Sequence, residues 1–302
     1  MIDTLFNQLN LEVIGKLKNN SVLLVKKTNS ADTNTYCLKM ATVEQEIKLF
    51  RDCFPKVNQD EFRRLKLPTG IKIGSLFLNK GWWVLMEYYG DDTIKWEETD
   101  PTHAGGRSIT ADYADILIDM LKDLRTIDID LFTNTIPTVD KCPWYIELPQ
   151  RAQSLVNRGI LLSSDLQKVT NLLSRDLSEE QKRNYIVTNG DFQFRNFIKQ
   201  PDGKVVVIDW TENTYNTPNI EPIEFPIMYQ WTLMWFNPTW QDLYIKKAME
   251  TFNLSPERLN YALVVKSINQ AHLWPGSPLA NIQIEHCIRG LNGQIINSNI
   301  IA

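Results

Sequence analysis

Two carboxylates and one amide have spacings that suit metal and proton chemistry between Tyr185 and Glu212. Asn196 follows Asp191 by five residues, and Asp209 comes at the end of an apolar run. Magnesium prefers oxygen ligands and keeps phosphate oxygens and waters in its other positions, so Asn196 and Asp209 are an adequate protein contribution. Asp191 is then free to accept a proton from a hydroxyl. The segment therefore predicts chemistry on a magnesium-bound phosphate.

A predicted turn explains how these side chains meet. The apolar runs Asn196–Ile198 and Val205–Ile208 flank a Pro-Asp-Gly-Lys sequence, which is typical of a β-hairpin. Because a hairpin folds its ends together, Asn196 and Asp209 are expected to be neighbours. The short apolar run Tyr185–Thr188 predicts a buried strand that leads into the first carboxylate.

This segment resembles the catalytic core of the kinase-like small-molecule phosphotransferases, the superfamily of aminoglycoside phosphotransferases and choline kinases. Their motif HGDxxxxN, followed by an apolar strand and IDW or IDF, compares with NGDFQFRN and IDW here. The resemblance implies that Asp191 is the catalytic base, Asn196 the first metal ligand and Asp209 the second. Asn189 stands where the family has a loop-bracing His. An ordinary loop before a hairpin is the alternative, and the terminal IDW argues against it.

Arg195 lies just before the amide of this motif. A guanidinium can bind phosphate oxygens in a fork, which favours a phosphate or substrate role. An exposed loop arginine, or one paired with a nearby carboxylate, is the alternative. Arg195 is therefore left outside the expected catalytic set.

A lysine on a predicted strand supplies the second part of the expected chemistry. Three strand-like runs are expected at Leu11–Leu17, Val22–Thr28 and Thr35–Met40. Lys39 lies in the third, which is half-buried, and a phosphate is its natural partner. The helix-like Val43–Phe54 follows, with Glu44 and Glu46 available to hold the ammonium. By resemblance, Lys39 is the phosphate-clamping lysine, and Glu46 is favoured over Glu44 as its partner.

Two more strand-like runs, Ile71–Leu78 and Gly81–Tyr89, complete an expected antiparallel sheet of about five strands. The second ends in WWVLMEYYG, which resembles the hinge of the same family. The resemblance implies that the backbone of Glu87–Tyr89 binds the adenine edge, with Met86 beside the base. A core strand whose aromatic residues simply pack is the plainer alternative.

The turn expected to cover the phosphates is poor in glycine. Only Gly15 lies near it, and the sequence has no GxGxxG pattern there. Asn19, Asn20 and Ser21 offer backbone amides instead, which makes Ser21 a candidate nucleotide-binding residue. A plain Asn-rich hairpin turn is the alternative.

The composition changes after the hinge. Asp91–Arg107 is polar and predicted to be a loop, while apolar residues between Tyr113 and Leu124 recur at intervals of three and four, typical of an amphipathic helix. Ser255-Pro256-Glu257 is a strong helix start. Further helices are expected at Glu147–Arg158, Asp165–Ser174, Glu224–Phe236, Thr239–Phe252, Pro256–Leu273 and Leu279–Arg289.

The expected fold is α+β and bilobal, resembling the protein-kinase fold. Residues 1–90 are expected to form a nucleotide-binding lobe, a five-stranded antiparallel sheet with one helix. Residues 91–302 are expected to form a larger, mostly helical lobe for catalysis and substrate binding. With 302 residues and 43% hydrophobic content, the chain has enough apolar side chains for this architecture.

Charge and cysteine use limit the partners. The formal net charge is −4, and no Lys or Arg cluster exceeds two residues, which argues against nucleic acid. We expect no membrane partner, because the sequence shows neither an apolar membrane span nor a cleavable signal. Four scattered cysteines without CxxC predict reduced thiols in a cytoplasmic protein, and the three histidines match no zinc motif.

These residues together predict ATP-dependent transfer of the γ-phosphate to a hydroxyl of a small molecule, with ATP and Mg as cofactors. Trp210, Thr211 and Glu212 are expected to line the mouth of the acceptor site. Acidic residues favour an amine-bearing acceptor such as an aminoglycoside, whereas tryptophans favour an aromatic wall or cage. Solvated acids and core tryptophans are the alternative. The residues concerned are Glu221, Glu224, Asp91–Asp100, Trp231, Trp235, Trp240 and Trp274.

Two rival functions follow from particular residues. Asn189 and the glycine-poor turn motivate a pseudokinase that binds nucleotide or a protein partner without turnover. A protein-substrate kinase is the second rival, and the absence of an APE-type activation segment after Trp210 argues against it.

Overall fold

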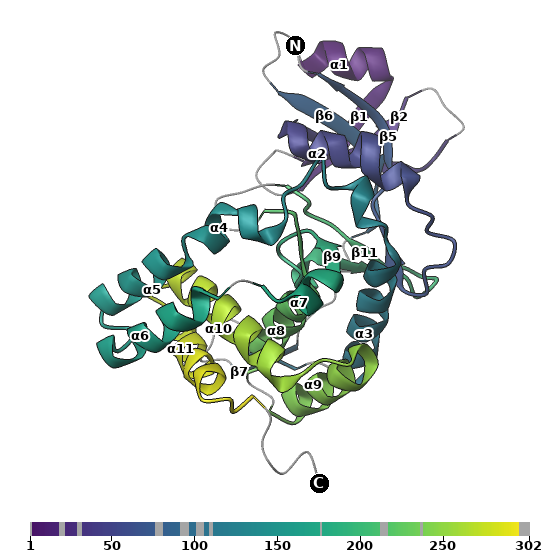
Figure 1. Cartoon of the computed structure of the whole chain (residues 1–302). Coiled ribbons are helices and arrows are strands. Elements are labelled where there is room, and N and C mark those ends of the chain that lie inside the picture. The colour runs from purple at the N-terminus through teal and green to yellow at the C-terminus, as the bar shows by residue number, and fades with distance from the viewer. Residues whose placement is uncertain are drawn as a thin grey trace.

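The computed structural model of the chain has a sheet-bearing upper part and a larger, mostly helical lower part, as Figure 1 shows. The structure describes residues 2–17, 22–28, 32–75, 81–90, 97–100, 106–108, 111–175, 177–211, 217–235 and 238–295. The expected α+β fold class is confirmed. The division into two domains at residue 90 remains a prediction.

The amino-terminal part is built on one five-stranded sheet, and every pairing in it is antiparallel. Its strands, in spatial order, are β1 (Leu11–Leu17), β2 (Val22–Lys27), β3 (Thr35–Thr42), β6 (Trp82–Glu87) and β5 (Gly70–Ser75). Lys39 of β3 lies opposite Val22 on one side and Val84 on the other. The predicted sheet is therefore confirmed, and Lys39 sits in its interior.

The helix after β3 is α-helical for only part of its length. The α2 helix (Glu44–Lys48) continues as a π-helix, Leu49–Cys53, and then as a 3₁₀ turn, Phe54–Lys56. Pro55 lies in that turn, and because proline has no N–H it cannot continue an α-helical ladder. The expected helix Val43–Phe54 is present, with this change of winding.

Alternation along the strands gives the sheet two buried faces. In β6, Trp83 and Leu85 pack in the cluster that includes the α1 helix (Ile2–Leu9), whereas Val84 between them packs with Phe50 beyond α2. Successive side chains of a strand point to opposite faces, so α1 and α2 cover opposite sides of the sheet. The sequence interpretation included α2 but not α1.

Helices form most of the carboxy-terminal part. They are α3 (Ala111–Thr126), α4 (Pro143–Ile146), α5 (Leu148–Asn157), α6 (Ser163–Leu173), α7 (Glu179–Arg183), α8 (Glu224–Leu233), α9 (Pro238–Phe252), α10 (Pro256–Leu273) and α11 (Pro278–Leu291). Short 3₁₀ turns lie at Ile129–Leu131, Val139–Lys141 and Phe194–Asn196. The α10 helix begins at the predicted residue, because the Ser255 side chain accepts a hydrogen bond from the backbone N–H of Arg258. It packs against α8 and α11 and is buried on nearly all sides.

The predicted hairpin is present and joins a strand from far upstream. The strands concerned are β9 (Tyr185–Thr188), β10 (Phe197–Lys199), β11 (Val205–Val207), β12 (Asn219–Pro222) and β4 (Leu65–Lys66). β10 pairs antiparallel with β11, and β11 pairs parallel with β4; β9 pairs antiparallel with β12. The backbone N–H of Ile208 donates to the carbonyl of Asn196 at 2.9 Å. The ends of the hairpin are therefore held together, as expected.

The segment before β5 packs with the helical part. Phe62 and Leu65 belong to the same core cluster as the apolar face of α3. The buried carboxylate of Asp123 in α3 accepts backbone hydrogen bonds from Arg63, Arg64 and Leu65 at 3.1, 2.6 and 2.7 Å. This part of the chain is thus fixed to α3, although it precedes half of the sheet in sequence.

The loop expected at Asp91–Arg107 is partly wrong. The structure has β7 (Glu97–Asp100) and β8 (Gly106–Ser108) there, paired antiparallel. Both strands are polar, so they carry none of the apolar alternation by which a half-buried strand is predicted.

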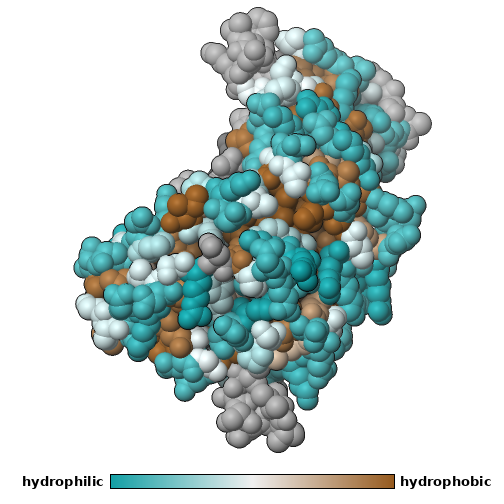
Figure 2. Space-filling model, viewed as in Figure 1, coloured by the Kyte–Doolittle hydropathy of each residue, from teal (hydrophilic) through white to brown (hydrophobic). Residues whose placement is uncertain are grey.

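Polar residues cover most of the face in Figure 2, where hydrophobic residues gather at the junction between the two parts. None of the described helices is both long and apolar enough to cross a membrane.

Candidate active site

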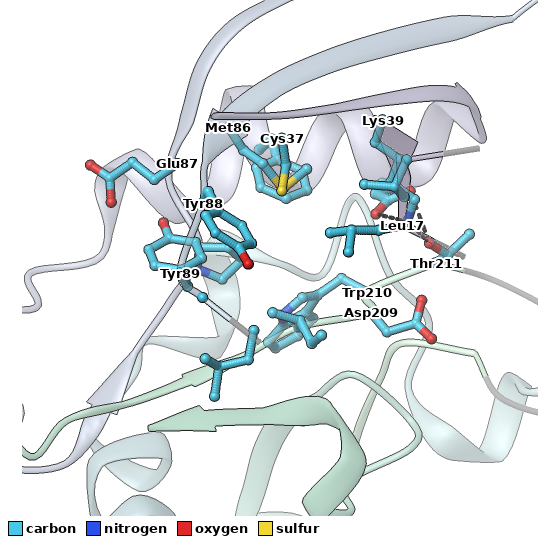
Figure 3. Close-up of a pocket in the computed structure, with 17 residues that line it drawn as sticks. Leu17, Cys37, Lys39, Met86, Glu87, Tyr88, Tyr89, Asp209, Trp210 and Thr211 are labelled. Atoms are coloured by element: carbon cyan, nitrogen blue, oxygen red, sulfur yellow. Dashed lines mark hydrogen bonds and ion pairs between the residues drawn. The ribbon is translucent and has the colours of Figure 1, made fainter. Parts of the chain in front are cut away.

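A cavity of about 520 Å³ lies between the sheet and the hairpin (Figure 3). Its walls are apolar, from the sheet on one side and from the hairpin and the residues after it on the other. These wall residues are Leu17, Val22, Cys37, Ile198, Ile208 and Trp210. Figure 3 places the hinge residues at one end and Lys39, Thr211 and Asp209 at the other. The cavity therefore has an apolar middle suited to a flat ring and a charged end.

The hinge is already cross-linked by its own hydrogen bonds. The Glu87 N–H donates to the carbonyl of Thr69 at 3.4 Å, and the Thr69 N–H donates to the Tyr89 hydroxyl at 2.7 Å. The Gln200 side chain donates to the Tyr89 carbonyl at 3.0 Å. The Glu87 side chain points away from the cavity and pairs with Lys66 at 3.5 Å, so any contribution of Glu87 to a ligand comes from its backbone.

Lys39 and Glu46 form an ion pair at the charged end of the cavity. The ammonium nitrogen lies 2.6 Å from Oε1 of the buried Glu46. Lys39 also donates to the hydroxyl of Thr211, which in turn donates to Glu46 Oε2 at 3.0 Å. Glu44 pairs with Lys48 at 3.1 Å instead and is largely exposed. Glu46, the favoured carboxylate, is thus the one that contacts Lys39.

The carboxylate of Asp191 is buried and surrounded by donors. Gln193 and the Tyr229 hydroxyl donate to Oδ1, the latter at 2.8 Å. Arg195 and the amide of Asn196 donate to Oδ2 at 3.1 and 2.9 Å. Burial and the neighbouring Asp191 charge raise the pKa of Tyr229 well above its usual 10, so this hydroxyl keeps its proton.

Asn189 braces the loop that carries Asp191. Its amide donates to the carbonyl of Ile208 at 2.9 Å, and its Oδ1 accepts the Asp191 N–H at 3.2 Å. One side chain therefore ties the loop that carries Asp191 to the residue before Asp209. Gly190 beside it has φ +75°, and a Cβ there would lie 2.3 Å from the Thr217 carbonyl, so only glycine fits.

Asn196 and Asp209 fit the oxygen-ligand role expected of them. The Asn196 amide nitrogen is used by Asp191, but its Oδ1 is buried and has no hydrogen-bond partner among the described residues. Such an orphaned oxygen is costly unless a cation or water meets it. Asp209 lines the cavity in a left-handed conformation, φ +61°. Because the described residues contain no group of three or more His, Cys, Asp or Glu able to hold a metal, further ligands would come from phosphate and water.

A buried ion pair lies behind the loop that carries Asp191. Lys266 of α10 contacts Glu221 of β12 at 2.9 Å, and both are buried. The other Glu221 oxygen accepts the Thr188 hydroxyl at 2.8 Å, and Thr188 accepts the Gly190 N–H at 3.2 Å. These contacts connect the loop that carries Asp191 to β12 and α10.

The acidic wall expected near the acceptor is wrong for Glu221 and Glu224. Glu221 is consumed by Lys266, and the fully buried Glu224 pairs with Arg258. Both glutamates are structural, because a buried carboxylate needs an opposite charge. The side chains of Asp91–Asp100 and the whole of Glu212 lie outside what the structure describes.

Two of the tryptophans considered for the acceptor site, Trp210 and Trp231, are core residues. Trp210 is buried, donates to the Val207 carbonyl at 2.8 Å and packs edge-on against Phe54, and it also lines the cavity. Its expected place at an acceptor mouth remains a prediction. Trp231 is also fully buried, which excludes it from an open cage. Trp274 is half exposed at the end of α10.

Sequence reasoning missed two residues near the site, Tyr229 and Gln193. Gln193 had a local signal, since it lies two residues after Asp191, but Tyr229 reads as an ordinary core aromatic. Thr211 was expected at the acceptor mouth, and its contacts with Lys39 and Glu46 were not expected. Of the candidate nucleotide-binding residues, Met86, Glu87 and Tyr89 line the cavity with Lys39. Ser21, with Asn19 and Asn20, falls outside the described residues.

Comparison with solved structures identifies proteins that share the fold of this chain. No protein-family model and no curated protein matches the sequence. Among solved structures, aminoglycoside 2′-phosphotransferase-IIIa in its GDP complex matches with a TM-score of 0.59 and 10% identity, over 97% of this chain and 96% of that one. A macrolide 2′-phosphotransferase type I matches with TM-score 0.58 and 13% identity, over 96% and 94%.

A spectinomycin phosphotransferase in complex with ADP and spectinomycin also matches, with a TM-score of 0.51 and 11% identity over 97% of both chains. These proteins differ in the antibiotic that their names give. What they share with this protein is the path of the backbone over nearly the whole length. The chain therefore has the kinase-like fold of the aminoglycoside, macrolide and spectinomycin phosphotransferases.

Proposed function

We propose that this protein transfers the γ-phosphate of ATP to a hydroxyl of a small molecule. The observation that carries the proposal is that Lys39 and Asp209 line one cavity with an apolar middle. The Asp191 loop is tied to the wall of this cavity, because Asn189 donates to the carbonyl of Ile208, the residue before Asp209. A nucleobase fits between the apolar walls beside the hinge. Its phosphates then extend toward Lys39 and Asp209.

Lys39 is proposed to neutralise charge on the α- and β-phosphates. Glu46 and Thr211 fix its ammonium, so little reorganisation is needed when the phosphates arrive. Asn196 and Asp209 would hold magnesium, which would offset the negative charge of the phosphates. Lys39, Asn196 and Asp209 thereby position the triphosphate and stabilise the charge that develops on it.

Asp191 is proposed to accept the acceptor's proton. The acceptor oxygen forms a bond to the γ-phosphorus, the bond between that phosphorus and the β–γ bridging oxygen breaks, and the hydroxyl proton passes to Asp191. ADP leaves with the bonding electrons. Positioning of the two oxygens in line supplies most of the rate enhancement.

The comparisons support a small acceptor. The names of the matched structures describe enzymes acting on aminoglycosides, a macrolide and spectinomycin, all hydroxyl-bearing small molecules. Amine-bearing and aromatic acceptors are the first classes to test. The contacts of Asn189 weaken the case for a pseudokinase, because this residue braces the loop as the family's His is expected to do.

A screen with labelled ATP over aminoglycosides, macrolides, amino alcohols, sugars and nucleosides tests the proposal. Asp191→Asn and Asp209→Asn are expected to lower transfer by about 10²–10⁴-fold. Asp202→Asn, an exposed aspartate in the turn of the same hairpin, is the matched control and is expected to keep full activity.

Magnesium-dependent ATP binding, measured in parallel, separates the alternatives. Binding without turnover across the whole panel would favour a pseudokinase. Full activity of a clean Asp209→Asn preparation would remove the metal assignment.

A further inference from the structure

The carboxylate of Asp191 is saturated with hydrogen bonds. A carboxylate has about four lone-pair sites, and four side chains donate to this one. Gln193 and Tyr229 occupy Oδ1, while Arg195 and Asn196 occupy Oδ2. An acceptor hydroxyl that is to give its proton to Asp191 must therefore first replace one of the four donors.

The four donors differ sharply in how firmly they are held. Tyr229 and Asn196 are buried, and the Asn196 amide also donates to the Asp191 carbonyl at 2.9 Å. Arg195 is the opposite case, because 56% of its side chain is exposed. Gln193 is only partly buried, and it lies on the same loop as Asp191, to which it donates.

We propose that Arg195 and Gln193 form a displaceable cap on the base, and that the acceptor hydroxyl takes the place of one of them. Tyr229 and Asn196 remain in place and hold the carboxylate, which makes Tyr229 a positioning residue. This inference rests on the proposed function of Asp191 as the base. It adds the statement that the base is closed until an acceptor arrives.

The physical reason lies in what replaces each contact. When an acceptor hydroxyl takes the place of Arg195, the released guanidinium is solvated because it is already exposed, so this contact is exchanged at little cost. Loss of the Tyr229 hydrogen bond leaves a buried carboxylate one donor short, which is costly.

A capped base also protects ATP. Water is the competing acceptor at any phosphotransferase site, and a water molecule needs the same lone pair of Asp191 as the substrate does. Water lacks the binding contacts of a larger acceptor, so it is the poorer competitor against the cap. The cap therefore selects against hydrolysis in the absence of an acceptor.

Acceptor-free ATP hydrolysis is the most direct test. We compare the wild type with Arg195→Met, Gln193→Met and the double variant, using magnesium-ATP alone. Hydrolysis is expected to rise about two- to fivefold in each single variant and further in the double one. Arg51→Met, which removes an exposed arginine paired with Asp52 at 2.7 Å, is the matched control and leaves hydrolysis unchanged.

Tyr229→Phe tests the donors that are proposed to stay in place on the Asp191 carboxylate. Its kcat for transfer is expected to fall about tenfold while the KM for ATP is unchanged, because the lost contact acts on the base. Tyr244→Phe is its matched control, since Tyr244 is a buried tyrosine whose hydroxyl has no hydrogen-bond partner among the described residues. A structural effect alone would change both variants alike.

The outcomes separate the cap from the function on which it rests. An active wild type, with hydrolysis unchanged or lower in the double variant at normal magnesium-ATP binding, overturns the cap. A wild type that neither hydrolyses nor transfers, indistinguishable from Asp191→Asn in every assay, overturns the proposed function and the cap with it.

Discussion

Among the described residues, two Lys–Glu pairs with a buried glutamate differ in their surroundings. Lys39 and Glu46 are 2.6 Å apart beside the cavity, and Lys266 and Glu221 are 2.9 Å apart behind the loop that carries Asp191. The side chain of Lys39 is 17% exposed and that of Lys266 is 5% exposed. The same chemical pair thus occurs once at an open site and once in a sealed one.

The difference lies in what else each ammonium meets. Three aromatic rings enclose the Lys266 nitrogen, with Trp144 at 4.9 Å, Phe225 at 5.3 Å and Tyr229 at 5.8 Å to their centroids. The Lys39 nitrogen instead borders a cavity with room for a nucleotide. Burial of a lysine therefore does not by itself mark a functional site. An ammonium that faces space for an anion is the more informative sign.

The largest expected effect is on the stability of the fold, when the buried pair of Lys266 and Glu221 is broken. Lys266→Met leaves the Glu221 carboxylate buried without its cation and is expected to cost about 3–5 kcal/mol in the free energy of unfolding. Urea denaturation measures this loss. Lys247→Met breaks an exposed pair with Asp115 and is expected to cost at most about 1 kcal/mol. Equal losses in the two variants would show that the buried pair contributes no more to stability than an exposed one.

For the pair beside the cavity, Lys39 and Glu46, we expect a large effect on activity and a smaller effect on stability. Lys39→Met should lower kcat/KM for ATP about 10²-fold, because phosphate charge loses its counterion. Its stability should change less than that of Lys266→Met, since Glu46 keeps the Thr211 hydrogen bond and borders the cavity. Steady-state kinetics and urea denaturation on one preparation give both numbers. A larger stability loss than in Lys266→Met would reverse the comparison.

A comparison of two neighbouring glutamates tests the importance of the ion pair between Lys39 and Glu46. Glu46→Gln is expected to lower kcat/KM for ATP about tenfold, because a charged hydrogen bond to Lys39 is lost. Glu44→Gln changes a side chain that is 62% exposed and pairs with Lys48, so kinetics should stay within error. Similar losses in both variants would mean that the ion pair with Lys39 is unimportant.

A buried group without an opposite charge extends the comparison to the dependence of stability on pH. Burial, with a smaller contribution from Arg289, lowers the pKa of His286 from 6.5 to about 3. Between these values the unfolded chain binds more protons than the folded one, so stability present above pH 6.5 is lost as the pH falls toward 3. The expected loss is about 1.4 kcal/mol per pH unit.

Urea denaturation of the wild type and of His286→Gln between pH 7 and pH 4 measures the contribution of His286. The variant should show the shallower dependence on pH, because only the wild type gains this proton on unfolding. Parallel curves would show that His286 titrates alike in both states.

Local signals explain which parts of the fold were predictable. The α10 helix matches its predicted range because Ser255 and Pro256 mark its start, and β1 matches because polar turns bound it. Strands without apolar alternation, such as β7, carry no such signal. Helix α1 was missed for a related reason, since a short amphipathic helix of eight residues, Ile2–Leu9, is a weak pattern in isolation.

The site shows the same limit. The motif residues were found because the spacing of Asp191, Asn196 and Asp209 lies within one segment. Glu221 was wrongly expected in an acidic wall near the acceptor because its partner Lys266 is 45 positions away, and Tyr229 was missed because it meets Asp191 across 38 positions. Long-range pairing of this kind leaves no trace in local periodicity. The roles assigned to the motif residues remain predictions until the variants are measured.

The fixing of residues 63–65 by Asp123 has a mechanical consequence. The chain leaves the helical part beyond β4, enters the sheet at β5 and returns after β6, so two crossings run side by side. Thr69 and Tyr89 join the two crossings through their N–H and hydroxyl at 2.7 Å. Because these two crossings are joined to each other, a hinge motion of the sheet relative to the helical part would have to move them together.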